Sequence, residues 1–166
     1  RHACINTQLS ALVSGSRVRL SKLATTYKVE HTYDYDRYDE CLKSGEVDAV
    51  YLALPNHLHK RYASAALRKG IHVLCEKPLS LTVSDSKAII RAAEEGGAKL
   101  MVAYRLHFDE ANLNLIGLGQ SGRLGDLRIV NSLFTQQVRK GDTRLDPMVG
   151  GGPLPDIGIY CINAAR

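Results

Sequence analysis

Short apolar runs alternate with amphipathic stretches over the first two thirds of the chain. The apolar runs occupy residues 8–14, 47–54, 71–76 and 98–104. Between them, apolar side chains recur at helical spacing over residues 18–28, 57–70 and 84–97. Alternation of buried strands with amphipathic helices is typical of parallel sheets, so the pattern predicts an α/β fold with a doubly wound parallel sheet.

Turn and capping residues mark the ends of these elements. Pro55 stops the run at 47–54, and Gly70 closes the helix that follows it. Thr82 or Ser84 can cap the next helix, because hydroxyl side chains accept hydrogen bonds from free amides at a helix start.

The rhythm changes after Arg105. A polar helix is predicted at about 109–117, followed by a glycine-rich turn. The stretch 124–136 alternates apolar and polar residues, which predicts a long strand, and residues 150–166 indicate a helix after three glycines. We therefore predict one domain over 1–105 and the beginning of a second domain over 106–166.

Composition excludes several classes of protein. Of the 166 residues, 45% are hydrophobic and 23% are charged, which is ordinary for a folded globular protein. The net charge of +5 is scattered, and with no Trp and two Phe there is little to stack on bases, so we expect no nucleic-acid partner. No apolar run reaches the length of a membrane helix, so no membrane association is expected.

The four cysteines lie far apart in the sequence and form no C-x-x-C pair. We therefore expect reduced, mostly buried thiols and no metal site. The N-terminal residues lack a secretory signal, so we expect a cytoplasmic protein, or a periplasmic one if an export signal precedes residue 1.

A doubly wound dinucleotide domain places a G-x-G-x-x-G loop between its first strand and first helix. The formal match GLGQSG at 117–122 follows a helix and leads into a predicted strand, so we interpret it as a turn. The first glycine of the chain, Gly15, follows what we interpret as the second strand. We expect the first strand and its phosphate-binding loop to be absent from this chain.

Ligands of open α/β sheets bind beyond the carboxyl ends of the strands, so residues just after each apolar run are the candidates. The first such segment carries small hydroxyl residues and two arginines where an acidic residue would hold a ribose. It comprises Ser14, Gly15, Ser16, Arg17 and Arg19. This favours NADP over NAD, because guanidinium groups bind a 2′-phosphate that a carboxylate would repel. The alternative is that both arginines are solvated at a helix start.

The second strand-end segment, Leu54, Pro55 and Asn56, is followed by two histidines. His57 and His59 lie two residues apart without a Cys or carboxylate partner, which makes a poor metal site. We expect loop and first-turn contacts to a ligand here instead.

Lys77 is the strongest catalytic candidate, because it stands at a strand end between Glu76 and Pro78. An ammonium held in a pocket donates to a substrate oxygen and stabilises negative charge that develops there. The proline fixes the backbone direction and thereby the aim of the side chain. An ordinary surface lysine is the alternative.

Asp156 and Tyr160 lie four residues apart in the last predicted helix and share one face of it. An ammonium beside the phenol would lower its pKa toward the range useful in proton transfer, so Lys77 and Tyr160 are expected to act as a unit. A helix cap for Asp156 and a core aromatic for Tyr160 are the alternatives. The three preceding glycines favour a site, because they would let a ligand approach closely.

Five segments carry a resemblance to a known family. They read SALVSGS, VDAVYLALPNHLH, GIHVLCEKPLS, KLMVAYR and GGGPLPDIGIYCINAAR. In order and spacing, the chain resembles the Gfo/Idh/MocA family of NAD(P)-dependent oxidoreductases, and within it the glucose-fructose oxidoreductase-like members.

The resemblance implies a Rossmann-like domain followed by an α+β domain with a mostly antiparallel sheet, which forms the interface of a homo-oligomer. It implies that Lys77 and Tyr160 are the catalytic pair, that Asp156 orients the substrate, and that the bond from Lys77 to Pro78 is cis. The cofactor residues it implies include Leu54, Pro55, Asn56, His59, Glu76, Lys77 and Arg105. The substrate residues it implies are Lys77, Arg105, Arg144, Asp156 and Tyr160.

The resemblance implies hydride transfer between NADP(H) and a sugar or polyol. The alternative is a sensor or regulator that keeps the dinucleotide fold without catalysis. Retention of both Lys77 and Tyr160 favours the enzyme, because a sensor has no need of the proton donor.

Overall fold

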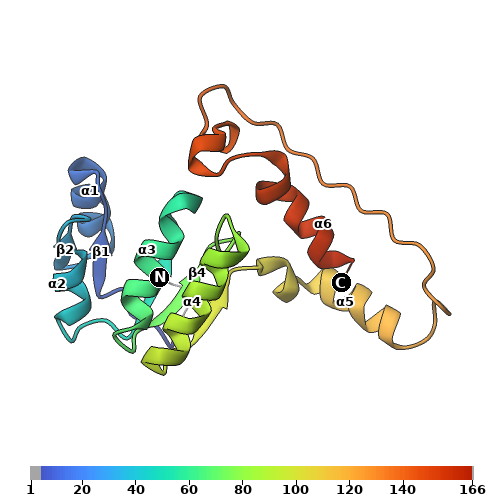
Figure 1. The fold of residues 1–166 in the computed structure, drawn as a ribbon, viewed down its shortest axis with the longest axis horizontal. Helices are drawn as coiled ribbons and strands as arrows, with labels where there is room; N and C mark the ends of the chain where they lie inside the picture. The colour runs from blue at the N-terminus through green and yellow to red at the C-terminus, as the bar shows by residue number, and fades with distance from the viewer. Residues whose placement is uncertain (1–4, 166) are drawn as a thin grey trace.

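The computed structural model describes residues 5–165 and divides into a sheet-containing part and a helical part with a long extended segment (Figure 1). The sheet-containing part comprises β1 (Ala11–Val13), α1 (Arg17–Tyr27), β2 (His31–Tyr33), α2 (Tyr38–Lys43), β3 (Ala49–Leu52), the 3₁₀ turn η1 (Asn56–Leu58), α3 (His59–Leu67), β4 (His72–Cys75), α4 (Val83–Gly96) and β5 (Leu100–Val102). The remainder comprises η2 (Arg105–Phe108), α5 (Glu110–Gln120), η3 (Thr143–Leu145), η4 (Pro147–Val149), the π-helical turn η5 (Leu154–Gly158) and α6 (Ile159–Ala164).

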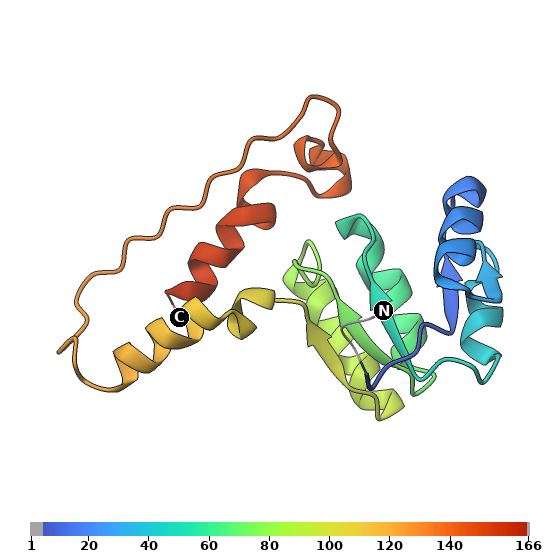
Figure 2. The same cartoon turned by 180° about the vertical axis from the view of Figure 1, so that it is seen from behind.

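The strands form two parallel sheets. β3, β4 and β5 pair in that order, with Leu52 opposite Cys75 and Cys75 opposite Val102. β1 and β2 form a separate parallel pair. α3 and α4 pack against each other and bury apolar side chains on the three-stranded sheet (Figures 1 and 2). The predicted α/β fold with parallel strands is confirmed.

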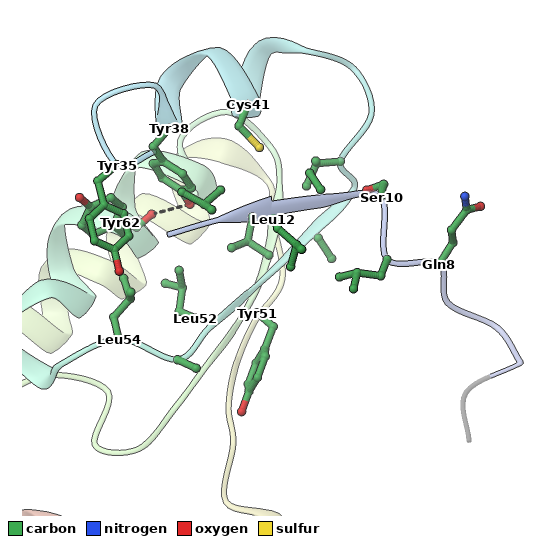
Figure 3. A pocket seen from close by; sticks show the side chains of 17 residues that line it. Gln8, Ser10, Leu12, Tyr35, Tyr38, Cys41, Tyr51, Leu52, Leu54 and Tyr62 are labelled. Atoms are coloured by element: carbon green, nitrogen blue, oxygen red, sulfur yellow. Dashed lines mark hydrogen bonds between the residues drawn. The ribbon is translucent and has the colours of Figure 1, made fainter. Parts of the chain in front are cut away.

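A cavity of about 350 Å³ separates the two sheets, between β1 and β3 (Figure 3). Its walls are mostly apolar and include Leu12, Leu52 and Tyr62. Facing strand edges carry backbone groups without ladder partners. A strand placed in this cavity could pair with both edges and join the two sheets into one. The first strand that the sequence analysis expects to be missing stays a prediction.

Local hydrogen bonds explain where α4 begins and ends. The Thr82 side chain accepts a hydrogen bond of 3.0 Å from the Asp85 amide, which makes Thr82 the N-cap. Gly97 takes the left-handed conformation at the other end, with φ of 62°, which glycine adopts without steric cost. The prediction of an N-cap at Thr82 or Ser84 is confirmed at Thr82.

Gly96 allows α4 to approach the end of α3 closely. A methyl group at this position would overlap the backbone carbonyl oxygen of Leu67, which cannot rotate away. We expect Gly96→Ala to lower the free energy of unfolding by about 3 kcal/mol, in the range of overpacked cores. Urea unfolding measures this loss.

Gly117→Ala in α5 is the matched control, because nothing lies within 4 Å of a methyl group added there. Replacing a glycine inside a helix stabilises it by up to about 1 kcal/mol. Equal unfolding midpoints for the Gly96 variant and the wild type would contradict the close-approach argument.

The prediction of a strand over 124–136 is wrong. The segment is extended, but it pairs with no strand among residues 5–165 and follows the outside of the molecule alone (Figures 1 and 2). Ile129 and Leu133 are 79% and 89% exposed. Without a neighbouring strand, its backbone groups are left to water and no ladder forms.

The chain returns from this segment so that the C-terminal end of α6 comes near α5 (Figures 1 and 2). The Asn163 side chain lies 2.6 Å from Nε2 of His107, which ties α6 to η2. Among the described residues, no hydrophobic side chain beyond Ala93 is buried. The core therefore lies entirely in the sheet-containing part.

Cys41 and Cys75 are buried free thiols and Cys161 is a half-buried one, while Cys4 lies outside the described residues. Burial raises the pKa of the Cys75 thiol to about 12, because a thiolate there would lose its hydration. In residues 5–165, no group of three or more His, Cys, Asp or Glu side chains could hold a metal ion. Over the same residues, every helix is too short or too polar to cross a membrane.

Candidate active site

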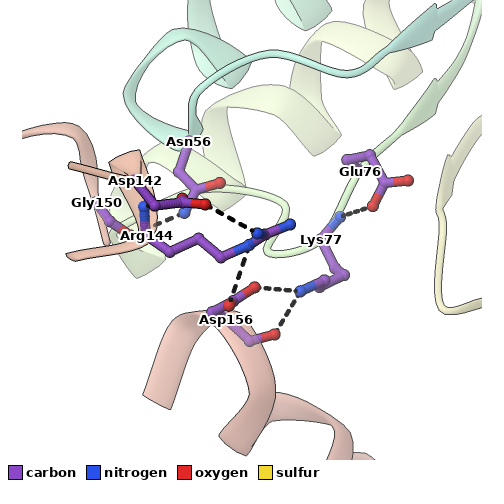
Figure 4. A network of polar contacts seen from close by, with 7 residues as sticks. All are labelled: Asn56, Glu76, Lys77, Asp142, Arg144, Gly150 and Asp156. Carbon is purple, nitrogen blue, oxygen red and sulfur yellow. Dashed lines mark hydrogen bonds and ion pairs between the residues drawn. The ribbon is translucent and has the colours of Figure 1, made fainter. Parts of the chain in front are cut away.

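Lys77 and Asp156 meet at the carboxyl end of the three-stranded sheet, although 79 positions separate them in sequence (Figure 4). Lys77 follows β4, and its bond to Pro78 is cis as the resemblance implied. Its Nζ donates to Oδ1 of Asp156 at 2.9 Å and also to the Asp156 backbone carbonyl. The ammonium is therefore held from two directions by one residue of η5.

A second cation contacts the other side of the Asp156 carboxylate. Nε of Arg144 lies 3.4 Å from Oδ2 of Asp156, and Nη1 of Arg144 lies 3.3 Å from Oδ2 of Asp142. The Asp142 side chain also accepts a hydrogen bond from the Arg144 amide at 2.9 Å. Charges of alternating sign thus run from Lys77 through Asp156 and Arg144 to Asp142 (Figure 4).

The pair at the centre is partly withdrawn from water. The side chains of Lys77 and Asp156 are 13% and 20% exposed, whereas Arg144 is 48% exposed. Ion pairs strengthen as local screening falls. Because an ammonium has three donors, Lys77 keeps a further N–H for a substrate oxygen when it holds Asp156 with two.

Tyr160 lies beneath the ammonium. Nζ of Lys77 is 5.0 Å from the centre of the Tyr160 ring, within the range of a cation–π contact. The ring stacks on Phe134, with centroids 5.5 Å apart, and meets Tyr104 edge-on at 6.5 Å. Lys77 and Tyr160 are therefore in contact, as expected, but the ammonium lies over the face of the Tyr160 ring. The sequence had predicted that it would lie beside the Tyr160 hydroxyl.

Glu76 is held between its own loop and a neighbouring strand. Its Oε1 accepts a hydrogen bond of 2.6 Å from the hydroxyl of Tyr51 on β3, and its Oε2 accepts one of 3.3 Å from the Lys77 amide. Donation to the carboxylate raises the pKa of Tyr51 to about 12, because the bond favours the protonated phenol. Tyr51 therefore orients the carboxylate that precedes the candidate catalytic lysine.

Two of the three glycines before η5 allow close packing within the chain. The carbonyl of Gly150 accepts a hydrogen bond of 2.8 Å from the Asn56 side chain, and a methyl group on Gly150 would overlap Leu81. A methyl group on Gly151 would lie 2.6 to 2.7 Å from three backbone carbonyl oxygens. Both glycines also line the cavity beside Lys77, so the expectation that they make room for a ligand stays a prediction.

A cavity of about 780 Å³ lies beside the Lys77–Asp156 pair, a size suited to a small-molecule ligand. Eight sequence-predicted residues line it: Arg19, Leu54, Pro55, Asn56, Glu76, Lys77, Arg144 and Asp156. Seven others do not: Ser14, Gly15, Ser16, Arg17, His59, Arg105 and Tyr160. The wall residues converge from the ends of β3 and β4 and from the segment before η5.

Three of the seven residues shape the start of α1 instead. Ser16 is the N-cap, and its hydroxyl accepts from the Arg19 amide at 3.3 Å. The Ser14 hydroxyl accepts from the Ser16 amide at 3.2 Å. A methyl group on Gly15 would lie 2.9 Å from the Tyr35 ring. Ser14, Gly15 and Ser16 therefore stabilise the turn that leads into α1.

His59 and Arg105 also lie away from the cavity wall. His59 is completely buried and its two ring nitrogens contact backbone carbonyls, so its side chain is closed to a ligand in this structure. Arg105 is exposed in η2. The expected ligand contacts of His59 and Arg105 stay predictions, and the positions of the two side chains do not support them.

Sequence reasoning missed two contributors, Asp142 and Tyr51. Asp142 caps η3. Its position two residues before Arg144 could have indicated this cap, because Asp side chains commonly accept from the amide two residues on. Tyr51 sits within an apolar strand, where nothing in the pattern indicates that its hydroxyl reaches Glu76.

A parallel sheet covered by helices, with its ligand cavity at the carboxyl ends of the strands, defines a Rossmann-like class of protein. Residues 1–104 match the sequence profile described as an oxidoreductase family with an NAD-binding Rossmann fold. Residues 115–166 match the profile of the GFO/IDH/MocA C-terminal domain. The chain belongs to the Gfo/Idh/MocA oxidoreductase family.

Two solved structures show the likeness in three dimensions. The aldose-aldose oxidoreductase of Caulobacter crescentus, complexed with glycerol, is 37% identical with a TM-score of 0.88, covering 99% of this chain and 50% of that one. KijD10, a 3-ketoreductase from Actinomadura kijaniata in complex with NADP and TDP-benzene, is 30% identical with a TM-score of 0.82, covering 98% and 50%.

Among curated proteins, an NADP⁺-dependent D-xylose 1-dehydrogenase from Haloferax volcanii is 34% identical over 161 residues. The match covers 96% of this chain and 49% of that protein. The chain spans about half the length of the curated relatives it matches.

Proposed function

We propose that the whole protein is an oxidoreductase that transfers a hydride between NADP(H) and a sugar or polyol. The observation that carries the proposal is the Lys77–Asp156 pair, held at 2.9 Å beside a cavity at the strand ends. Lys77 donates to the reacting oxygen of the substrate, Asp156 holds the ammonium in place, and Tyr160 moves the proton. The names of the relatives, which act on xylose, inositol and nucleotide-linked sugars, support a carbohydrate substrate.

The wall of the cavity fits a dinucleotide in its chemistry. Leu54, Pro55 and Asn56 supply the end of β3, and Glu76 supplies the end of β4, where the nicotinamide end is expected to lie. Bound NADP supplies the hydride chemistry. The chain's own residues bind and orient the two reactants and hold the proton.

Arg19 is the residue proposed to select NADP over NAD. It lines the cavity, and residues 14–19 contain no carboxylate to repel a 2′-phosphate. We expect Arg19→Ala in the whole protein to raise the Kd for NADPH about tenfold or more, the effect of one lost charged hydrogen bond. The Kd for NADH should stay within about threefold, because NADH has no 2′-phosphate for Arg19 to bind.

Arg17→Ala is the matched control, because Arg17 begins the same helix but does not line the cavity. Fluorescence titration with both cofactors measures the two ratios. An equal loss for NADPH and NADH in the Arg19 variant would contradict a role in selecting the phosphate.

The proposed function is tested by titrating the whole protein with NADPH and NADH and then following cofactor absorbance with a panel of aldoses and polyols. NADPH binding followed by turnover of a carbohydrate supports the proposal. Binding of NADPH without turnover of any substrate would support a sensor instead. Absence of binding to either cofactor would contradict both.

We further propose that the whole protein is a homo-oligomer. Apolar side chains exposed on α5 and on the extended segment, including Leu115, Ile129 and Leu133, support a covered face in the assembled protein. Light scattering of the whole protein measures its mass. A cytoplasmic location stays a prediction.

A further inference from the structure

His59 is a completely buried polar side chain behind the wall of the candidate active site. It is the first residue of α3, and its exposed fraction is 0%. Its Nδ1 lies 2.8 Å from the carbonyl oxygen of Pro78, and its Nε2 lies 3.0 Å from the carbonyl oxygen of Leu54. One ring thus bridges two separate loops.

Both partners of the ring are carbonyl oxygens, which only accept hydrogen bonds. A ring that donates to both carries a proton on each nitrogen. A neutral ring has one N–H, so it would satisfy one carbonyl and turn a lone pair toward the other. A ring protonated on both nitrogens would bury a positive charge whose contacts are two carbonyls and no carboxylate. A neutral ring with one donated N–H therefore fits the burial, and losing that bond is costly.

The two bridged carbonyls belong to residues of the cavity wall. Pro78 follows Lys77 directly, and Leu54 comes just before Pro55 and Asn56. The neighbouring charges are engaged elsewhere, since Lys60 pairs with Asp85, Lys77 pairs with Asp156, and Glu76 accepts from Tyr51. The Glu76 amide donates to the Leu52 carbonyl at 2.9 Å where the two strands end. Beyond that backbone bond neither loop belongs to a strand or helix, and the ring joins them there through Leu54 and Pro78.

We propose that His59 is a positioning residue that clamps the Lys77–Pro78 loop to the end of β3, with Nδ1 donating to the Pro78 carbonyl and the other side of the ring packed against the Leu54 carbonyl. The clamp fixes the direction in which the ammonium of Lys77 approaches a substrate. This role rests on the proposed oxidoreductase function, whereas the contacts of the ring do not.

Two substitutions separate the two ends of the clamp. His59→Asn keeps a nitrogen donor near the place of Nδ1 and so keeps the bond to Pro78. His59→Gln moves the donor to the place of Nε2, toward Leu54, and so loses the bond to Pro78. Since a displacement of about 1 Å costs about 100-fold in rate, we expect His59→Gln to lower kcat by about 10- to 100-fold. His59→Asn should retain kcat within about fivefold, and KM for NADPH should change little in either variant.

Packing alone predicts the opposite order, because asparagine is smaller than glutamine and leaves the larger cavity. Steady-state kinetics and melting temperatures of both variants decide between the two explanations. A higher kcat for the Gln variant than for the Asn variant, or equal losses that follow the melting temperatures, would overturn the positioning role.

A spectroscopic measurement tests the clamp without any turnover. In the whole protein with ¹⁵N-labelled histidine, the signals lost in His59→Gln should show a proton on Nδ1 of the wild type. A proton on Nε2 alone would overturn the clamp even in an active enzyme. A proton on Nδ1 in a protein that turns over no carbohydrate would remove the proposed function and leave the clamp in place.

Discussion

Lys77→Ala in the whole protein is expected to lower kcat by about 10²- to 10³-fold, the usual effect of removing one donor aimed at developing charge. The Kd for NADPH should change by less than about threefold, because the ammonium is held by Asp156 and its proposed partner is the substrate oxygen. The loss falls on kcat because the bond to the reacting oxygen strengthens as charge develops there. Steady-state kinetics with fluorescence titration separate the two quantities.

Lys60→Ala is the matched control for this experiment. Lys60 also pairs with an aspartate, Asp85 at 2.5 Å, but its side chain is 51% exposed and lies outside the cavity. Exposed ion pairs contribute little to stability, so kcat and the melting temperature should both stay close to those of the wild type. A similar loss of cofactor binding and turnover in the Lys77 variant would contradict the assigned role.

The sequence predicted the elements that have a strong local signal. The runs at 47–54 and 71–76 contain β3 and β4, and Thr82 caps α4 as expected. Buried parallel strands are continuous apolar runs, so their positions can be identified without knowing their partners.

Elements that depend on distant partners were not predictable in this way. β2 has three residues and α2 has six, so neither is long enough to show a period, although Tyr38 and Leu42 are buried. The opposite error occurred at 124–136, where a clear alternation forms no strand because no neighbour is present among the described residues.

Some residues of the candidate site could likewise be predicted from the sequence, and others could not. Lys77, Asp156 and Asn56 lie where strand ends and one helical segment converge, which the sequence order of strands and turns predicts. The burial of His59 and the reach of Tyr51 to Glu76 depend on how side chains pack across elements. A motif indicates which residues gather, but it does not indicate which of them face the ligand.

Tyr160→Phe is expected to lower kcat by about 10²- to 10⁴-fold in the whole protein, because it removes the hydroxyl proposed to move the proton. The phenylalanine ring retains the contact with the Lys77 ammonium and the stacking on Phe134. Stability and NADPH affinity should therefore stay near those of the wild type. Kinetics, unfolding and cofactor titration of the one variant measure these three quantities.

The contact between the Lys77 ammonium and the face of the Tyr160 ring suggests a second role for Tyr160. If the ring alone mattered, as a platform that holds Lys77 through its π-face, Tyr160→Phe would retain kcat and Tyr160→Leu would lose it. Tyr104→Phe is the control, because Tyr104 meets the same ring edge-on at 6.5 Å, whereas the ring that lies under the Lys77 ammonium is that of Tyr160. Loss of kcat in the Tyr160→Phe variant, with the Tyr104 variant unchanged, would assign the proton transfer to the hydroxyl. Retained kcat would leave Tyr160 as a support for Lys77 and require another proton donor.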